Sequence, residues 1–493
     1  MSRLILSRRR LIGASLALPL TATGFSARAQ AGDPLEIGRS VAALYAPSAT
    51  PELRTLFWRD RLSEAGRQRA PLAEFQAAAT AVTATTDGVD VLDAHALPGQ
   101  VLLKLRSRRH GAARWVRVRI DRDEADRLFD LASHPSPAPY DHEGPTGPVS
   151  RPRLADEIER RLAFATANDD FSGAVLVAAP DGEVVWSGAV GVADRAGGLA
   201  NNLGTRFHLG SADKSFTALM IGRLVHEGRL GFGTRLIEVL PDYPNRPFAE
   251  ACTIDQLLTH ASGLGSLFDR PGWDGERPFT HMADLFPAFV HEPPIFAPGT
   301  GQRYSNEGFV VLGAVIEAVA GRSWYDLLAE QVYQPANMAA SGHFRGDEAV
   351  ANRAIGYRYA DDDQFGLGER LPKDPARSYR GNSCGGGYST VGDMTRYLRA
   401  LRAGWLLPPE ALQPLVTPQV GGLRDYGRGF FTRTVAGRLT VGHSGGGPHS
   451  GIDGDHAIVW ETGWSLSILG NYDAPFAGDI SRDIMRWLAV QDA

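Results

Sequence analysis

The chain is 493 residues long, which exceeds the about 100–200 residues of one ordinary domain. Its 43% hydrophobic and 22% charged residues are typical of a globular protein. The net charge of -5 excludes the broad basic surface that nucleic-acid binding requires, and it disfavours binding to an anionic membrane. Basic residues are almost all arginine, because the lysines are only Lys104, Lys214 and Lys373.

Residues 1–31 have the organisation of an export signal, with a basic patch, an apolar stretch and small-residue cleavage sites after Ala29 and Ala31. The apolar stretch Leu11–Phe25 is shorter than the about 20 residues that a membrane-spanning helix needs. The arginines within Ser7–Ile12 favour a twin-arginine signal, and a Sec signal with additional arginines is the alternative. Either signal predicts a bacterial periplasmic or extracellular protein without a stable membrane anchor.

Residues 33–132 predict a small α+β accessory domain. Helical patterns come first and are followed by alternating apolar and polar residues in 88–97, 99–109 and 113–123, as half-buried strands require. A helix followed by an antiparallel sheet resembles a cystatin-like or NTF2-like module. No catalytic cluster is found here, and Lys104 falls within a strand pattern.

A second, larger domain is predicted over residues 153–493, after a Pro/Gly-rich linker at 133–152. A helix and the strand pair 172–191 begin this domain, and strands followed by a helix end it. A sheet that uses strands from both ends, flanked by helices, predicts an α/β (α+β) architecture. No Gly-x-Gly-x-x-Gly follows a strand, so no nucleotide cofactor is indicated.

The cysteines and the histidine-rich stretch give no sign of a metal ion. Cys252 and Cys384 lack the spacing of a zinc site or a redox pair, and two separate buried thiols are favoured over a disulfide. The stretch His449–His456, "HSGIDGDH", has no known metal-ligand spacing. We therefore expect neither a metal nor another cofactor.

The stretch Leu209–Met220, "LGSADKSFTALM", places Lys214 three residues after Ser211. A serine hydroxyl needs a neighbouring base, and a partly desolvated lysine can serve whereas an arginine stays protonated. The apolar spacing predicts a helix, on which Ser211 and Lys214 share a face at the positive end of the dipole. The alternative is a serine cap followed by a surface lysine.

Two later motifs carry matching chemistry. A tyrosine hydroxyl such as that of Tyr304 ionises more easily beside an ammonium, and Asn306 offers both a donor and an acceptor to an ester or amide. The run His443–Gly446 follows a strand pattern, where small residues allow a substrate to lie on the strand and an N–H group to complete an oxyanion hole. Taken separately, each motif also fits an ordinary turn.

In this order and over this distance, the three motifs resemble those of the serine β-lactamase, penicillin-binding protein and esterase superfamily, in its class C-like branch. The similarity extends through Thr253–Leu264, Phe296–Asn306 and Gly385–Leu401, and it covers nearly all of 153–493. It implies a β-lactamase/transpeptidase-like fold, in which an antiparallel sheet is flanked by helices and joined to a helical section. Within the first of these stretches, His260 is expected to be structural.

The resemblance implies that Ser211 attacks a carbonyl to form an acyl-enzyme, while Lys214 and Tyr304 share the proton transfers. It also implies that Asn306 holds the substrate and that the amides of Ser211 and Gly446 form the oxyanion hole. Water then releases the acyl group. The other residues implied to bind substrate are His443, Ser444 and Gly445.

His443 departs from the pattern of many β-lactamases and D,D-peptidases, which have a lysine there that binds the substrate carboxylate. A histidine is mostly neutral at pH 7, so this anchor is weakened. We therefore expect a serine hydrolase acting on an ester or amide, as an esterase or D-amino peptidase rather than a true β-lactamase. Its substrate is a small molecule or peptide, with cell-wall peptides as one source. The alternatives are a non-catalytic penicillin-binding sensor and a wall-binding protein that works through residues 33–132.

Overall fold

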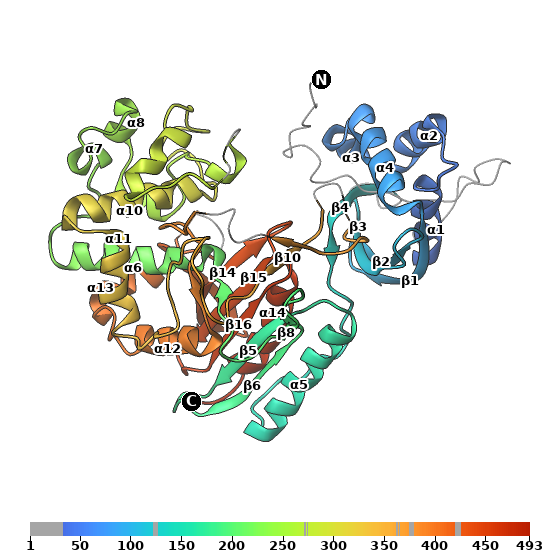
Figure 1. Cartoon of the computed structure of the whole chain (residues 1–493). Helices are drawn as coiled ribbons and strands as arrows, with labels where there is room; N and C mark the ends of the chain where they lie inside the picture. The colour runs from blue at the N-terminus through green and yellow to red at the C-terminus, as the bar shows by residue number, and fades with distance from the viewer. Residues whose placement is uncertain are drawn as a thin grey trace. The chain divides into compact units, whose positions relative to one another are not determined.

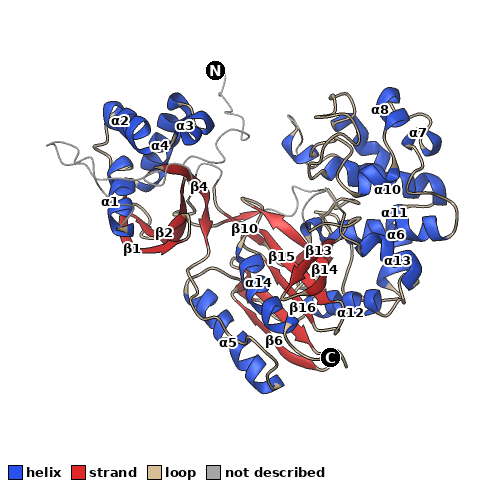
Figure 2. Cartoon of the chain, turned by 180° about the vertical axis from the view of Figure 1, so that it is seen from behind, coloured by secondary structure: helices blue, strands red, loops and turns tan. Residues whose placement is uncertain are grey.

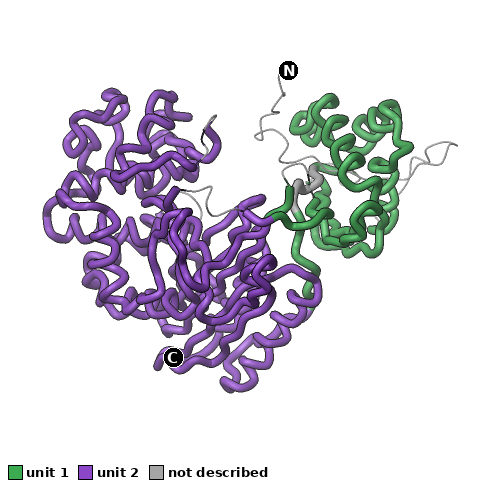
Figure 3. Tube along the Cα trace, in the orientation of Figure 1, with its two compact units in different colours: residues 1–141, 358–371 green, residues 142–357, 372–493 purple. Residues whose placement is uncertain are grey.

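The computed structural model of the chain divides into two compact units, residues 1–141 with 358–371 and residues 142–357 with 372–493 (Figure 3). The structure describes residues 33–121, 127–270, 273, 275–360, 363, 365–373, 379–419 and 425–493. The predicted export signal lies outside the described residues. No helix in these ranges is both long and apolar enough to cross a membrane.

The first unit has helices followed by an antiparallel sheet, in the strand order β1-β2-β3-β4 (Figure 1). The helices are α1 (Pro34–Leu44), α2 (Pro51–Arg61), α3 (Glu64–Arg69) and α4 (Leu72–Thr86). The strands are β1 (Val89–Leu97), β2 (Gln100–Ser107), β3 (Ala113–Ile120) and β4 (Leu128–Ser136). Asp33, Thr50 and Ser63 cap the first three helices by accepting backbone N–H bonds, which satisfies donors that a helix start leaves unpaired.

The segment 358–371 belongs to this first unit, although the sequence analysis assigned it to the larger domain. Phe365 and Leu367 are 2% and 0% exposed and lie in the same apolar core as Val116 on β3. The ring of Phe365 meets that of Tyr45 edge to face, with centroids 5.4 Å apart. The first unit is therefore built from two separate stretches of the chain.

The second unit contains a six-stranded antiparallel sheet in the order β13-β14-β15-β16-β5-β6. Its strands are β5 (Gly173–Ala178), β6 (Val184–Val190), β13 (Phe431–Val435), β14 (Arg438–Gly447), β15 (Ile452–Val459) and β16 (Ser465–Gly470). The sheet thus joins the beginning and end of the unit, as the sequence predicts. Helices α5 (Arg151–Ala167) and α14 (Phe476–Ala489) pack on it, with α12 (Val391–Arg402) on the other side (Figures 1 and 2).

The helical section lies between β6 and β13 in the chain. It includes α6 (Asp213–His226), α7 (Leu236–Val239), α8 (Arg246–Ala251), α9 (Ile254–Leu258), α10 (Asn306–Ala320), α11 (Trp324–Leu328) and α13 (Pro409–Val416). Three separate two-stranded sheets also lie between β6 and β13 in the chain: β7 (Val192–Asp194) with β8 (Leu199–Ala200), β9 (Phe207–His208) with β12 (Tyr388–Ser389), and β10 (Gly356–Arg358) with β11 (Leu371–Lys373). Helix α6 is buried over nearly its whole length, because it passes through the centre of this section.

An ion-pair cluster joins the first and last helices of the second unit. Arg161 on α5 is 2% exposed, and its Nε and Nη2 donate to Asp483 and Asp479 on α14 over 2.7 and 2.6 Å. Removing the guanidinium takes from Asp483 its ion-pair partner among the described residues, while Asp479 keeps Arg482 on its own helix. We expect Arg161→Ala to lower the free energy of unfolding by about 3–5 kcal/mol, measured by urea denaturation. Arg161→Lys should recover part of this loss, and equal stability of Arg161→Ala and wild type would contradict the argument.

Candidate active site

Ser211 and Lys214 lie together at the start of the central buried helix. Ser211 is in a 3-10 turn, Gly210–Ala212, that leads directly into α6. One helical turn later, the Nζ of Lys214 lies 3.1 Å from Ser211 Oγ. The spacing that the sequence predicted therefore brings nucleophile and amine within hydrogen-bond distance.

The amino group of Lys214 is fully buried and bonded on all sides. Besides Ser211 Oγ, it donates to Asn306 Oδ1 over 2.7 Å and to the carbonyl of Cys384 over 2.6 Å. These three acceptors match the three donors of an ammonium. Among the described residues, no carboxylate lies within ion-pair distance of Nζ, which is instead 4.9 Å from the centroid of the Tyr304 ring.

Asn306 is oriented from both ends of its side-chain amide. Its Oδ1 accepts from Lys214, and its Nδ2 donates to Ser266 Oγ over 2.8 Å. The residue begins α10, whose N-cap Ser305 accepts from the N–H of Gly308. The helix start therefore fixes where Asn306 stands, and the amide bridges the lysine to the loop that carries Ser266.

Tyr304 precedes this cap and packs against His260, with ring centroids 4.3 Å apart. The imidazole Nδ1 of His260 accepts from the N–H of Ser305 over 3.0 Å. Burial, with the nearby Lys214 charge, holds the pKa of His260 well below its usual value. His260 is thus a neutral support under the Tyr304–Asn306 stretch, and the Tyr304 hydroxyl makes no hydrogen bond to any residue that the structure describes.

The third motif lies on β14, directly against the turn that carries Ser211. A Cβ on Gly445 would overlap the carbonyl oxygen of Leu209 and stand 2.9 Å from the Ser211 nitrogen. A Cβ on Gly210 would stand 2.8 Å from the Gly446 nitrogen. Only glycines permit this approach, which brings the two amides predicted for the oxyanion hole to one place.

His443 is buried beneath this strand, with 1% of its surface exposed. Its Nδ1–H donates to the Ser444 carbonyl over 2.6 Å, which leaves Nε2 as the acceptor for the Tyr426 hydroxyl at 3.3 Å. Burial and the charge of Lys214 hold the pKa of His443 well below its usual range, so the ring is neutral at pH 7. The sequence analysis placed His443 among the substrate-binding residues, whereas its ring offers almost no exposed surface and the half-buried Ser444 is the nearer group to solvent.

A buried acid–histidine pair beside the lysine was missed by the sequence analysis. Asp213 Oδ2 accepts from His343 Nε2 over 3.1 Å and from the N–H of Gly387 over 2.6 Å. Both side chains are buried. The pair ties α6 to the segment whose Cys384 carbonyl accepts from Lys214. The only sequence signal was an acidic residue at the start of an apolar helix, because His343 is 130 positions away.

Cys252 and Cys384 are both buried and unpaired, as the sequence favoured. Burial raises the pKa of the Cys384 thiol to about 11 and that of Cys252 to about 12, so both are inert at neutral pH. Within the described ranges, no group of His, Cys, Asp and Glu has the arrangement of a metal site.

The larger unit is similar to known proteins in sequence and in fold. A model of the family described as Beta-lactamase matches residues 154–490, which is more than half of the chain, so this chain belongs to the beta-lactamase family. Penicillin-binding protein 4* of Bacillus subtilis (strain 168) is 29% identical over 295 residues, covering 56% of this chain and 63% of that protein. Esterase EstB of Burkholderia gladioli is 30% identical over 307 residues, covering 56% of this chain and 77% of the esterase.

A solved structure supports the same assignment. The penicillin binding protein from Bacillus halodurans has 29% identity and a TM-score of 0.58, with 67% of this chain and 98% of that chain covered. The resemblance and the β-lactamase/transpeptidase-like fold predicted for the larger domain are thereby confirmed. The chain spans less than two thirds of the length of two Bacillus subtilis relatives, penicillin-binding protein 4* and putative penicillin-binding protein PbpX.

The position of Lys214 can be tested by Lys214→Arg, which keeps a cation but removes a group able to accept a proton. We expect the rate of Ser211 acylation by a fluorophosphonate probe to fall by about 10²–10⁴-fold, as followed by intact mass. Lys104→Arg, on a strand of the first unit, is the matched control and should acylate at the wild-type rate. An undiminished rate in Lys214→Arg would show that this amine is not the base.

The buried histidines predict how stability depends on pH. Burial lowers the pKa of His456 to about 4, whereas an unfolded histidine titrates near 6.5. Between these values the unfolded chain binds more protons, so the free energy of unfolding falls as the pH falls from about 6.5 to about 4. We expect His456→Gln to reduce this slope by up to about 1.4 kcal/mol per pH unit, measured by urea denaturation between pH 7 and 5. Identical slopes for variant and wild type would contradict the assignment.

Proposed function

We propose that this protein is an exported serine hydrolase, which cleaves an ester or an amide through an acyl-enzyme formed on Ser211. The observation that carries the proposal is the buried Lys214 amino group 3.1 Å from Ser211 Oγ, held by Asn306 and by the Cys384 carbonyl. Membership of the beta-lactamase family and the similarity to an esterase support it. Export rests on the sequence of residues 1–31.

The Lys214 Nζ donates to three oxygens in the resting site, so the form that reacts is the one that has lost the proton directed at Ser211 Oγ. Acylation begins when the lone pair of that amine accepts the hydroxyl proton of Ser211. The Oγ atom then bonds to the substrate carbonyl carbon, and the carbonyl electron pair moves to its oxygen. The N–H groups of Ser211 and Gly446, which lie where β14 approaches the turn that carries Ser211, stabilise this oxyanion. Because these donors are backbone groups held by the η1 turn (Gly210–Ala212) and by β14, they need no reorganisation during the step.

Release of the leaving group requires a proton, which the Tyr304 hydroxyl supplies as the carbon–oxygen or carbon–nitrogen bond breaks. The Lys214 ammonium returns a proton to Tyr304, whose ring lies 4.9 Å from Nζ. Water then attacks the ester on Ser211 while the same pair accepts its proton. Proton return to Ser211 Oγ frees the acid product and restores the site.

The substrate that the site favours is an ester or a peptide-like amide rather than a β-lactam. The third motif begins with a buried, neutral histidine, so it supplies no cation at the position where a β-lactam carboxylate would be held. A small molecule or a peptide, including one derived from the cell wall, matches this chemistry. The similarity to an esterase at 30% identity supports the ester branch.

The proposal is tested by labelling with fluorophosphonate and penicillin probes, followed by intact mass. We expect one adduct in wild type and in Ser187→Ala, which removes an exposed serine on β6, and none in Ser211→Ala. Hydrolysis of p-nitrophenyl esters, nitrocefin and D-amino-acid peptides then defines the substrate, and activity in the periplasmic fraction tests export.

Three outcomes would contradict this function. An adduct that survives Ser211→Ala would move the nucleophile elsewhere, and failure of every probe to label would remove the acyl-enzyme. Acylation without turnover of any substrate in the panel would favour the non-catalytic penicillin-binding sensor instead.

A further inference from the structure

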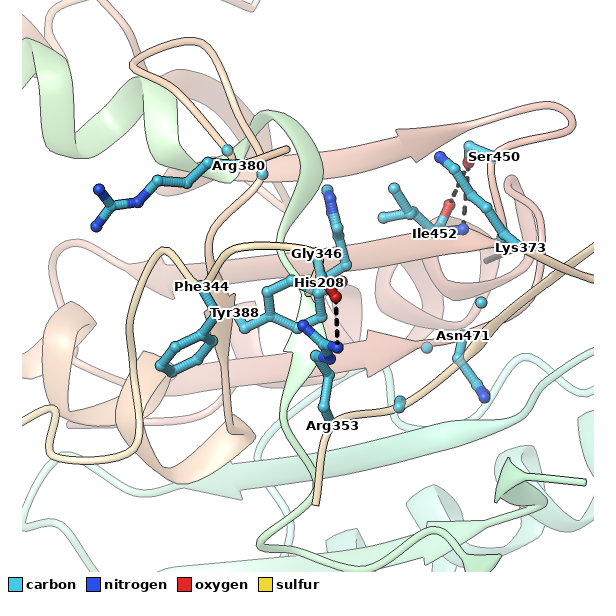
Figure 4. Close-up of a pocket in the computed structure, with 16 residues that line it drawn as sticks. His208, Phe344, Gly346, Arg353, Lys373, Arg380, Tyr388, Ser450, Ile452 and Asn471 are labelled. Atoms are coloured by element: carbon cyan, nitrogen blue, oxygen red, sulfur yellow. Dashed lines mark hydrogen bonds between the residues drawn. The ribbon is translucent and has the colours of Figure 1, made fainter. Parts of the chain in front are cut away.

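A pocket in the larger unit lies beside the turn that carries Ser211 and is lined by charged and aromatic side chains (Figure 4). Its free space measures about 50 Å³, which is room for a few water molecules or one small polar group. Tyr388 on β12 and His208 on β9 contribute neighbouring rings, with centroids 5.1 Å apart. Arg353 and Lys373 supply the positive charge.

The pocket borders both parts of the predicted oxyanion hole. On one side, the N–H of Gly386, which lines the pocket, donates to the Gly210 carbonyl over 3.2 Å. On another side, His208 Nδ1 accepts from the N–H of Gly210 over 3.0 Å. Ile452, also in the lining, pairs with Gly447 at the end of β14, one residue after Gly446. The lining of the pocket thus contacts Gly210 and Gly447, which are the chain neighbours of Ser211 and Gly446.

The position along β14 decides which part of a substrate reaches the pocket. Tyr304, the proposed proton donor to the leaving group, belongs to the aromatic cluster of His260, Tyr426 and His443. That cluster stands before Gly445 on the strand, whereas the pocket stands after Gly446. A leaving group beside Tyr304 therefore leaves the acyl substituent to extend toward the pocket.

The guanidinium of Arg353 is held in place by backbone carbonyls rather than by a carboxylate of the described residues. It donates to the carbonyls of Arg345 and Gly346 over 3.1 and 3.2 Å, and its Cζ lies 5.8 Å from the centroid of the Tyr388 ring. These bonds occupy two of its five N–H donors. Among the described residues no carboxylate pairs with Arg353. The acid nearest to it in the chain, Glu348, accepts from the backbone N–H of Arg345 over 3.2 Å, and the next, Asp347, bonds to the Arg345 side chain.

Two further residues make the pocket suited to a negative group. Lys373 is one of three lysines in a chain that otherwise uses arginine, and it adds a second cation. Because Nδ1 of His208 accepts from Gly210, the neutral ring carries its proton on Nε2, as a donor. Burial and the charge of Lys373 lower the pKa of His208 to about 3, so this donor is neutral at pH 7. No acidic residue is found among the described lining residues.

Arg380 also borders the pocket, but its guanidinium turns away from the other cations (Figure 4). Its Nε donates to the His343 carbonyl over 2.8 Å, and its Cζ lies 3.6 Å from the centroid of the Tyr325 ring. Arg380 is therefore a wall of the pocket, while Arg353 and Lys373 provide its charge.

We propose that this pocket binds a carboxylate on the acyl part of the substrate, through Arg353 and Lys373. The inference rests on the proposed hydrolase function and narrows it to acyl groups that end in an acid. The third motif has no cation at His443, in the middle of β14. The proposed anionic anchor lies past the end of that strand, where it selects the acyl group rather than the leaving group.

The test compares two esters of equal chain length, p-nitrophenyl pentanoate and the mono-p-nitrophenyl ester of glutaric acid. We expect wild type to have the higher kcat/KM for the glutarate ester, and this preference should decrease with ionic strength. Arg353→Gln and Lys373→Gln should each lower the ratio of the two kcat/KM values at least about tenfold, since a hydrogen bond to a charged group is lost. Arg353→Lys, which restores the charge, should recover part of the ratio.

Arg402→Gln is the matched control, because Arg402 also donates to two backbone carbonyls, those of Trp460 and Glu461, and lies outside the pocket. It should keep the wild-type ratio. Circular dichroism and the melting temperature identify any variant that misfolds. If Arg353→Gln misfolds, Lys373→Gln alone tests the proposal. Ser211-dependent hydrolysis with an unchanged ratio in the folded pocket variants would overturn the pocket and leave the hydrolase standing.

If neither ester is hydrolysed by wild type, that result counts against ester hydrolysis and the pocket is tested by binding alone. Calorimetry of Ser211→Ala with glutarate should then show binding that Arg353→Gln removes, and no binding would overturn the pocket. Inorganic phosphate is the competing anion in both assays. If phosphate inhibits hydrolysis of the glutarate ester, or binds to Ser211→Ala, more strongly than glutarate does, the assignment of the pocket to a carboxylate is overturned.

Discussion

The site depends on how the buried amino group of Lys214 is held. Taking a cation out of water costs several kcal/mol unless its hydrogen bonds are replaced. Here three neutral oxygens replace them, and they come from three separate parts of the larger unit: Ser211 in the turn before α6, Asn306 at the start of α10 and the carbonyl of Cys384 before β12. None of the three bears a negative charge that would favour the protonated amine. One side chain therefore joins three segments and remains suited to proton transfer.

The surroundings of this amine are kept free of competing charge. His260 and His443 are neutral because they are buried and close to Lys214, and burial keeps the Tyr426 hydroxyl protonated by raising its pKa. The acid next to the lysine in the chain, Asp213, bonds to His343 and the Gly387 amide. These hydrogen bonds of Asp213 hold the segment that carries the Cys384 carbonyl. Burial thus keeps the two histidines near the amine neutral, and the buried Asp213–His343 pair holds the segment that supplies one of its acceptors.

The residues that form the chemical centre could be predicted because each is constrained by side-chain type. Lys214 could be predicted because an arginine three residues after Ser211 would stay protonated, whereas the roles of Tyr304 and Asn306 followed from the resemblance of three ordered motifs to a known superfamily. The sheet and its flanking helices followed from periodicity at the two ends of the larger unit. The carbonyl of Cys384 and the Asp213–His343 pair could not be found, because a backbone oxygen has no sequence identity and the pair spans 130 positions. His443 was placed at the substrate because a strand pattern does not distinguish its buried from its open face.

The return of segment 358–371 to the first unit changes what a truncation means. Phe365 and Leu367 fill the core of a unit whose other residues lie more than 200 positions earlier. A chain cut at residue 141 would yield a first unit with a cavity in its core. The second unit would then expose the apolar side chains of Phe365 and Leu367. The first unit consequently cannot be removed by a single cut in the chain. The segment between β10 and β11 and the amino-terminal residues 33–141 must be gained, lost or exchanged together. Chimeras within this family will keep both units intact only if they exchange residues 358–371 together with the amino-terminal residues of the first unit.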